Sequence, residues 1–136
     1  MRVVLDSNVL ISALISAGSP PDLIYQAWRE KRFTLVTSEM QLAELRRASR
    51  YPKLQKLVSS REFGVLINRL HGARVLDKLP QIDLSSDPAD NYLLAMAAAS
   101  EADVLVTGDT KGLLRLKKFA HTRILTPGSF LKVFKT

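Results

Sequence analysis

The sequence predicts an α/β fold with a doubly wound, mainly parallel sheet, and three observations support this prediction. Short apolar runs, such as Arg2 to Leu5 and Val104 to Val106, alternate with longer segments of helical periodicity. The second run has no polar side chain, which is typical of a central parallel strand that is covered on both faces. The 136 residues, 46% of them hydrophobic, suffice for one core but not for two ordinary domains. We therefore expect a single domain over residues 1–136.

Apolar periodicity and turn residues predict the elements of the first half of the chain in order. They are a strand at 2–5, a buried helix over 9–15, a turn at 18–22, a helix with the apolar stripe Leu23, Ile24, Ala27 and Trp28, a strand at 33–36, and a helix that Ser38 caps and that continues to about Arg50. Tyr51 and Pro52 then break this helix, because the residue before a proline avoids the helical region.

The second half continues the alternation of helices and strands. It is expected to contain two helices with apolar stripes near 54–58 and 63–70, a short strand at 73–76, a loop at 79–83, a helix that begins after Asp87, a strand at 104–106, a last strand at 122–125, and a closing helix with Phe130, Leu131 and Phe134. The helix after Asp87 has no charged or strongly polar side chain from Tyr92 to Ala99, so it should be buried on most sides.

Two acids are predicted to lie at the ligand-binding edge of this sheet. Asp6 directly follows the first strand, and Asp109 follows the strand at 104–106. Both therefore lie at carboxyl ends, where open α/β sheets collect ligands near the point at which strand order reverses. Asp6 or Ser7 is equally suited to cap the next helix, and this simpler role is an alternative to a ligand role for Asp6.

Two further acids are expected to reach the same edge from helices. Asp90 lies in the first turn of the helix that Asp87 caps. Glu44 shares a helical face with Met40 and Ala48, which places an acid on an apolar stripe. The alternative for Glu44 is an ion pair with a neighbouring arginine on a solvated face.

Four converging carboxylates predict a divalent cation. Like charges about 4 Å apart cost roughly 4 kcal/mol per pair at an effective dielectric of about 20, so the cluster needs protons, lysines or a metal ion. Oxygen ligands without cysteine favour Mg²⁺ or Mn²⁺ over structural zinc. A water on such an ion is a ready nucleophile for a phosphodiester. Hydroxyl and amide groups that could orient it are Ser7, Asn8, Ser38 and Thr107.

The charge balance suggests a polyanionic partner. Twenty Lys and Arg against thirteen Asp and Glu give a net charge of +7, which favours nucleic acid. The middle of the chain is rich in cations that we expect to contact phosphates, including Arg46, Arg47, Arg50 and Lys53, although a solvated basic face is the commoner meaning of such a run. No apolar run approaches the roughly 20 residues of a membrane span, and we expect a cytoplasmic protein.

Four ordered motifs give the chain a family resemblance. They are V-V-L-D-S-N-V-L-I-S-A at the start, S-E-M-Q-L-A-E-L in the middle, D-P-A-D-N-Y-L-L-A-M-A with V-L-V-T-G-D, and I-L-T-P-G-S-F-L near the end. Together they closely resemble the PIN-domain proteins, and more narrowly the small prokaryotic VapC-like ribonucleases described as toxin components of toxin-antitoxin systems. The resemblance spans essentially the whole chain.

The resemblance implies a fold, an activity and a set of site residues. The fold is a three-layer α/β sandwich with a mainly parallel sheet, related to the flap and 5′-nucleases, and the active members are Mg²⁺- or Mn²⁺-dependent ribonucleases. The metal-binding and catalytic acids carried over are Asp6, Glu44, Asp90 and Asp109, with Asn8, Ser38, Thr107 and Asp87 in support. RNA is the implied substrate, Lys111 joins the cations expected to contact it, and an antitoxin protein and a second subunit are the implied partners.

Two other classes of function compete with this interpretation. A catalytically inactive PIN-like module would keep the acids only as a charged pocket for nucleic acid or protein. A receiver domain or a phosphohydrolase with a covalent aspartate is less well supported, because Asp6-Ser7-Asn8 lacks the second acid that such phosphohydrolases carry two residues on. The chain also has no phosphate-binding G-x-x-x-x-G-K-[ST] loop.

Overall fold

A six-stranded sheet forms the centre of the computed structural model, which describes residues 1–109 and 112–134. Its strand order is β3-β2-β1-β4-β6-β5, and every neighbouring pair is parallel except β5 and β6. The strands are β1 (Arg2–Leu5), β2 (Thr34–Ser38), β3 (Arg74–Leu76), β4 (Val104–Val106), β5 (Lys118–Phe119) and β6 (Thr122–Leu125). The expected mainly parallel sheet is confirmed.

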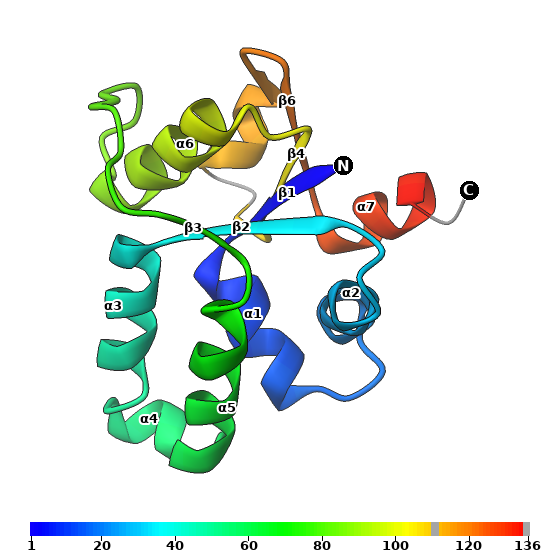
Figure 1. Cartoon of the computed structure of the whole chain (residues 1–136), viewed down its shortest axis with the longest axis vertical. Coiled ribbons are helices and arrows are strands. Elements are labelled where there is room, and N and C mark those ends of the chain that lie inside the picture. The colour runs from blue at the N-terminus through cyan, green and yellow to red at the C-terminus, as the bar shows by residue number, and fades with distance from the viewer. Residues whose placement is uncertain (110–111, 135–136) are drawn as a thin grey trace.

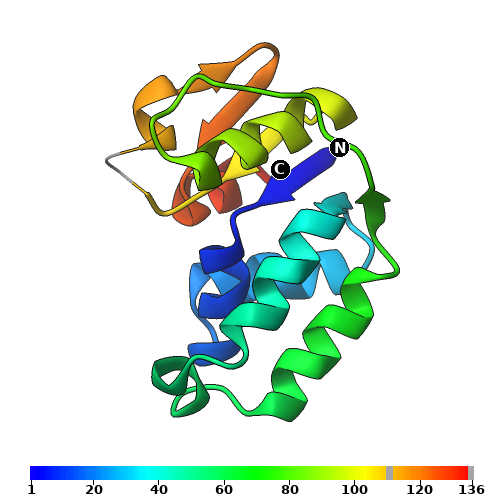
Figure 2. The same ribbon diagram turned by 90° about the vertical axis from the view of Figure 1, so that its left-hand side faces the viewer.

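Helices cover both faces of the sheet and give a three-layer α/β sandwich. They are α1 (Ser7–Ile15), α2 (Pro20–Arg29), α3 (Glu39–Ala48), α4 (Pro52–Gln55), α5 (Ser60–Leu70), α6 (Pro88–Ser100), the 3-10 helix η1 (Leu113–Leu116) and α7 (Pro127–Phe134). Figure 1 shows α6 above the sheet and α1, α2, α3 and α5 below it. Figure 2 shows α3 and α5 running side by side in the lower layer.

The alternation of side chains along each strand builds two cores. Val3 and Leu5 of β1 point into a large apolar cluster formed with α1, α2, α3, α5 and α7, whereas Val4 between them points into a smaller cluster with α6. The middle strands are therefore buried on both faces, as their uninterrupted apolar runs predict. Helix α6 is buried over most of its length, which confirms the interpretation of its apolar sequence.

Several details differ from the expectations. Leu23 is 43% exposed and Met40 is 53% exposed, so neither belongs to a buried stripe. Helix α3 packs inward through Leu42 and Leu45, which turns the face with Met40 away from the core and makes the predicted apolar setting of Glu44 wrong on that side. Strand β5 was not expected, because its two residues pair with β6 across a tight turn and leave no periodic pattern.

The topology places a binding edge between β1 and β4. Strand β1 has β2 on one side and β4 on the other, so strand order reverses where β1 meets β4. The backbone N–H of Asp6 donates to the carbonyl of Val106 at 2.9 Å, which joins the carboxyl ends of the two strands. Such a reversal point is where α/β sheets place their ligands. Within the described residues, no helix is both long and apolar enough to cross a bilayer.

Candidate functional site

A pocket of about 400 Å³ opens at the carboxyl ends of β1 and β4. Segments α1, α3, α6 and the residues after β4 contribute its walls. All four predicted acids line it, together with the cap of α6: Asp6, Glu44, Asp87, Asp90 and Asp109. No Lys, Arg or His is among the described residues that line it. The structure thus brings these acids to one cavity.

Two hydrogen bonds hold the carboxylate of Asp6. Its carboxylate accepts hydrogen bonds from the backbone N–H of Asn8 at 3.2 Å and from the Thr107 hydroxyl at 2.8 Å. The same Thr107 oxygen accepts the backbone N–H of Asp109 at 3.1 Å, so one buried hydroxyl links two of the acids. Burial raises the pKa of Asp6 above its usual 3.8, the two hydrogen bonds lower it, and the charges of Glu44 and Asp109 raise it further.

Asp90 and Asp109 face the same small volume. A Cβ placed on Gly112 would lie 2.8 Å from one Asp90 oxygen and nearer still to one of Asp109, so only a glycine leaves this volume open. The Gly112 N–H donates to Asp109 at 3.1 Å. Asp90 is only 7% exposed, and its burial raises its pKa. The Ser85 hydroxyl, 3.2 Å away, opposes that shift, while three neighbouring acids reinforce it.

Glu44 is oriented by a tyrosine. The Tyr92 hydroxyl donates to one Glu44 oxygen at 2.6 Å, and Ser7 Oγ lies 3.2 Å from the same hydroxyl. Gln41 donates to Ser7 at 3.3 Å and to the carbonyl of Leu5 at 2.7 Å, which fixes this network to the end of β1. Burial, followed by the contact with Glu44, raises the pKa of Tyr92, so its phenol stays a proton donor.

The remaining predicted residues occupy different positions relative to the pocket. Asn8 is exposed and lines it, and Asp87 lines it while capping α6 through the N–H of Ala89 at 3.0 Å. Ser38 is buried away from the lining, where it caps α3 and donates to Met96 Sδ. The four cations that were expected to contact phosphates are exposed on α3, on α4 and between them, and do not line the pocket: Arg46, Arg47, Arg50 and Lys53. Lys111 lies outside the described residues.

Comparison with known proteins identifies the family. A family model described as PIN domain matches residues 2–111. The chain belongs to the PIN-domain family. The active members of this family are nucleases. The family resemblance of the four sequence motifs is therefore confirmed.

One known protein resembles this PIN domain in sequence, and one solved structure resembles it in fold. The uncharacterized protein MJ1680 of Methanocaldococcus jannaschii is 28% identical over 145 residues, which span 99% of this chain and 92% of that protein. A chain in the crystal structure of VapBC2 from Rickettsia felis, bound to a DNA fragment from their promoter, matches with a TM-score of 0.61 at 19% identity. That match covers 93% of this chain and 98% of the other, and it confirms the predicted fold.

Four polar residues of this PIN domain escaped prediction from the sequence. Tyr92 donates to Glu44, Gln41 donates to Ser7 beside that tyrosine, and Ser85 donates to Asp90. Asn91 accepts from the N–H groups of Leu84 and Ser85 at 3.1 and 2.8 Å, which positions Ser85. A weak signal existed for Gln41, because it lies three residues before Glu44 and hence near the same helical face.

The donor chemistry of the pocket fits a hard divalent cation. Carboxylates dominate its polar lining, and Asp90 and Asp109 already face one volume. Nevertheless, within the described part of the chain no three Asp, Glu, His or Cys side chains lie close enough together to hold a metal ion. The described part of the PIN domain thus has Asp90 and Asp109 facing each other, with further acids around them.

Proposed function

We propose that this PIN domain is an endoribonuclease that hydrolyses RNA phosphodiester bonds with Mg²⁺ or Mn²⁺. The observation that carries the proposal is the meeting of Asp6, Glu44, Asp90 and Asp109 in one cavity. Mutual repulsion and burial make this arrangement unfavourable unless positive charge is supplied. A divalent ion would supply it, and all four acids are the proposed ligands.

The bound ion would lower the pKa of a water and stabilise the leaving oxygen. The protein's own part is to hold the ligands. Thr107 fixes Asp6 from a fully buried position, and Tyr92 fixes Glu44. Asn8 is exposed at the pocket, where its amide can orient a water or a phosphate oxygen. Asp87, already engaged as a helix cap, is proposed to contact the ion only through water.

Substrate binding is proposed to use the cations beside the pocket. Arg46, Arg47, Arg50 and Lys53 lie exposed along α3, on α4 and between them, and Arg50 and Lys53 directly precede Tyr51 and Leu54 of the pocket wall. Their charges would hold the phosphates on either side of the cleaved bond. Lys111 is also proposed to contact RNA, and Ser38 is proposed to support the site, as expected from the sequence.

The likeness to the VapBC2 structure supports a role as the toxin of a toxin-antitoxin pair. Such a role requires an inhibitory antitoxin protein, which would occupy the pocket and exclude RNA. We also propose that the protein acts in the cytoplasm and pairs with a second copy.

Cleavage of a single-stranded RNA in the presence of Mn²⁺ tests the proposal. We expect Asp109→Asn to lower the rate by more than about 100-fold, because even partners of metal ligands cost 10- to 100-fold. Asp83→Asn is the matched control, since Asp83 is exposed and does not line the pocket. Unchanged cleavage by Asp109→Asn would reject the assigned site. RNA binding by the wild type without cleavage or Mn²⁺ uptake would instead favour an inactive binding module.

A further inference from the structure

A second concave region lies at the opposite end of the sheet. Two adjoining hollows of about 260 and 480 Å³ share Trp28, Lys31 and Gly72 in their lining, and we call them together the amino-end hollow. Thr34, the first residue of β2, and Arg74, the first residue of β3, line its larger part. Glu44, by contrast, is carried by α3, which begins after the other end of β2. Five strand residues span about 17 Å, so the hollow is separate from the carboxylate pocket.

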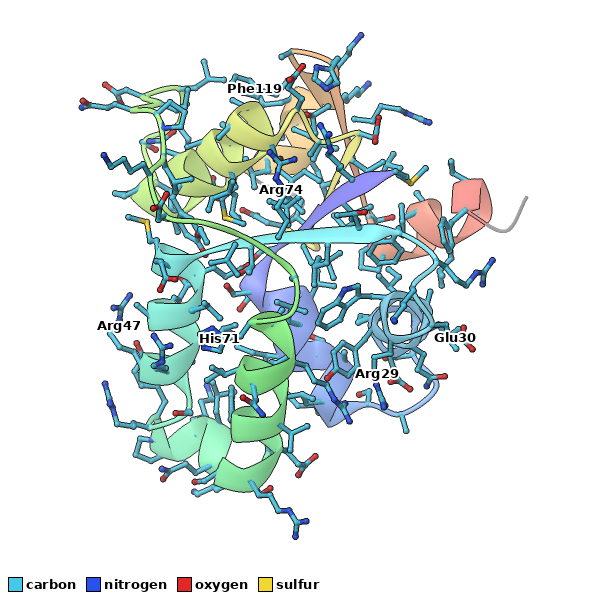
Figure 3. All side chains as sticks on the ribbon, in the orientation of Figure 1. Arg29, Glu30, Arg47, His71, Arg74 and Phe119 are labelled. Atoms are coloured by element: carbon cyan, nitrogen blue, oxygen red, sulfur yellow. The ribbon has the colours of Figure 1, made fainter. Side chains whose placement is uncertain are left out.

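The amino-end hollow is lined by cations. Its charged lining residues come from α2, the turn after it, α5 and β3, and they are Arg29, Lys31, Arg32, Arg69 and Arg74. No Asp or Glu is among the described residues that line it. Figure 3 shows Glu30, the nearest acid along the chain, on the outer side of α2 and away from α5. Acidic and basic side chains thus line cavities at opposite ends of the sheet.

Contacts hold two of these cations, Arg69 through its side chain and Lys31 through its backbone. The Arg69 guanidinium donates to the Tyr25 hydroxyl at 3.0 Å, which joins α5 to α2. Lys31 has a φ of 60°, a left-handed conformation that most residues other than glycine avoid. The N–H of Lys31 donates to the carbonyl of Trp28 at 2.8 Å and closes this turn. The turn therefore holds Lys31 beside the indole that both parts of the hollow share.

We propose that the amino-end hollow binds the phosphate backbone of a single-stranded nucleic acid. Lysine and arginine bind phosphates by charge, and an aromatic ring beside them is the usual platform for an unpaired base. Trp28 is the aromatic residue in this position: it is partly buried against the core and lines both hollows. The choice of RNA over other nucleic acids rests on the proposed function.

Trp28 supplies a direct readout, because it is the chain's one tryptophan. The whole protein is titrated with a short oligouridylate in EDTA, so that binding is measured without cleavage. We expect a saturable change in tryptophan fluorescence and an affinity that falls steeply with salt. Binding without a fluorescence change would overturn the proposal. So would equally tight binding of inorganic tripolyphosphate, or fluorescence-detected binding of polyglutamate in place of the oligonucleotide.

Two matched double variants distinguish binding at the amino-end hollow from general attraction by the protein's net positive charge. Arg29→Gln with Lys31→Gly removes two lining cations, and glycine readily keeps the left-handed turn. Arg115→Gln with Lys117→Gly is the control, because both residues are exposed, Lys117 also has a positive φ of 59°, and neither borders the hollow. We expect the first pair to weaken binding about tenfold and to reduce the salt slope by about 1.4. Equal losses in both pairs would overturn the proposal.

The two proposals fail independently. Cleavage in Mn²⁺ by the wild type, measured in parallel, tests the nuclease assignment alone. Oligonucleotide binding in EDTA that depends on Arg29 and Lys31 would support the amino-end hollow even if no cleavage were found. Cleavage without such binding would leave the nuclease proposal intact and reject this site.

Discussion

Replacing Tyr92 with phenylalanine tests whether Glu44 works through its hydrogen bond. Tyr92 is 9% exposed and its hydroxyl donates to Glu44 at 2.6 Å, so Tyr92→Phe removes one hydroxyl while the ring stays packed. A hydrogen bond to a charged group contributes about 1.5–3 kcal/mol. If catalysis depends on the orientation that this bond gives Glu44, the rate should fall by roughly 10- to 140-fold. The free energy of unfolding should change less, by about 0.5–1.5 kcal/mol, because Glu44 is partly exposed and water can replace the phenol.

Two measurements on Tyr92→Phe test this reasoning. The first is kcat for Mn²⁺-dependent RNA cleavage, which should fall with little change in KM because Tyr92 lies deep in the pocket. The second is calorimetric affinity for Mn²⁺, which should weaken in parallel. Thr122→Val is the control, since Thr122 is also buried and its hydroxyl donates to the carbonyl of Ala102 instead. Equal activity in the wild type and Tyr92→Phe, or equal losses in both variants, would refute the positioning role.

Further predictions concern Asp6 and Gly112. Burial raises the pKa of Asp6, so the folded state binds its proton more tightly than the unfolded chain, and stability falls as pH rises from 3.8 through the raised value. In EDTA, the melting temperature of Asp6→Asn should therefore exceed that of the wild type, by a difference that grows as pH rises over that range. RNA cleavage by this variant should be lost. Equal melting temperatures at every pH would contradict the prediction. Gly112→Ala should weaken Mn²⁺ binding, because its Cβ would displace Asp90 and Asp109. A Cβ at Gly64 would meet open space, so Gly64→Ala should bind Mn²⁺ normally. Equal Mn²⁺ affinities in the two variants would contradict the predicted clash at Gly112.

Much of the fold follows from local sequence features. The apolar runs at Arg2–Leu5 and Val104–Val106 are strands at the predicted positions, because only a strand covered on both faces uses such runs efficiently. Asp87 and Pro88 begin α6 as their capping chemistry predicts. Strand β5 could not be predicted in this way, since its two residues are defined only by pairing with β6.

The acids of the pocket were predictable, whereas the groups that hold them were not. Asp6 and Asp109 follow strands directly, so topology alone sends them to one edge. Tyr92 reaches Glu44 from 48 residues away, and no local pattern encodes that contact. The exposure of Met40 has a similar origin, because the orientation of α3 depends on its packing against α5 and β2. Periodicity defines a helical face without saying what it will contact.

Anomalous scattering from a crystal soaked in Mn²⁺ tests the proposed metal centre most directly. We predict a peak beside the carboxylates of Asp90 and Asp109, with Asp6 and Glu44 turned toward it and ligand distances near 2.1 Å. Asp109→Asn crystals should lose that peak under the same conditions. A pocket without manganese, or manganese bound only elsewhere on the protein, would contradict the metal-dependent mechanism.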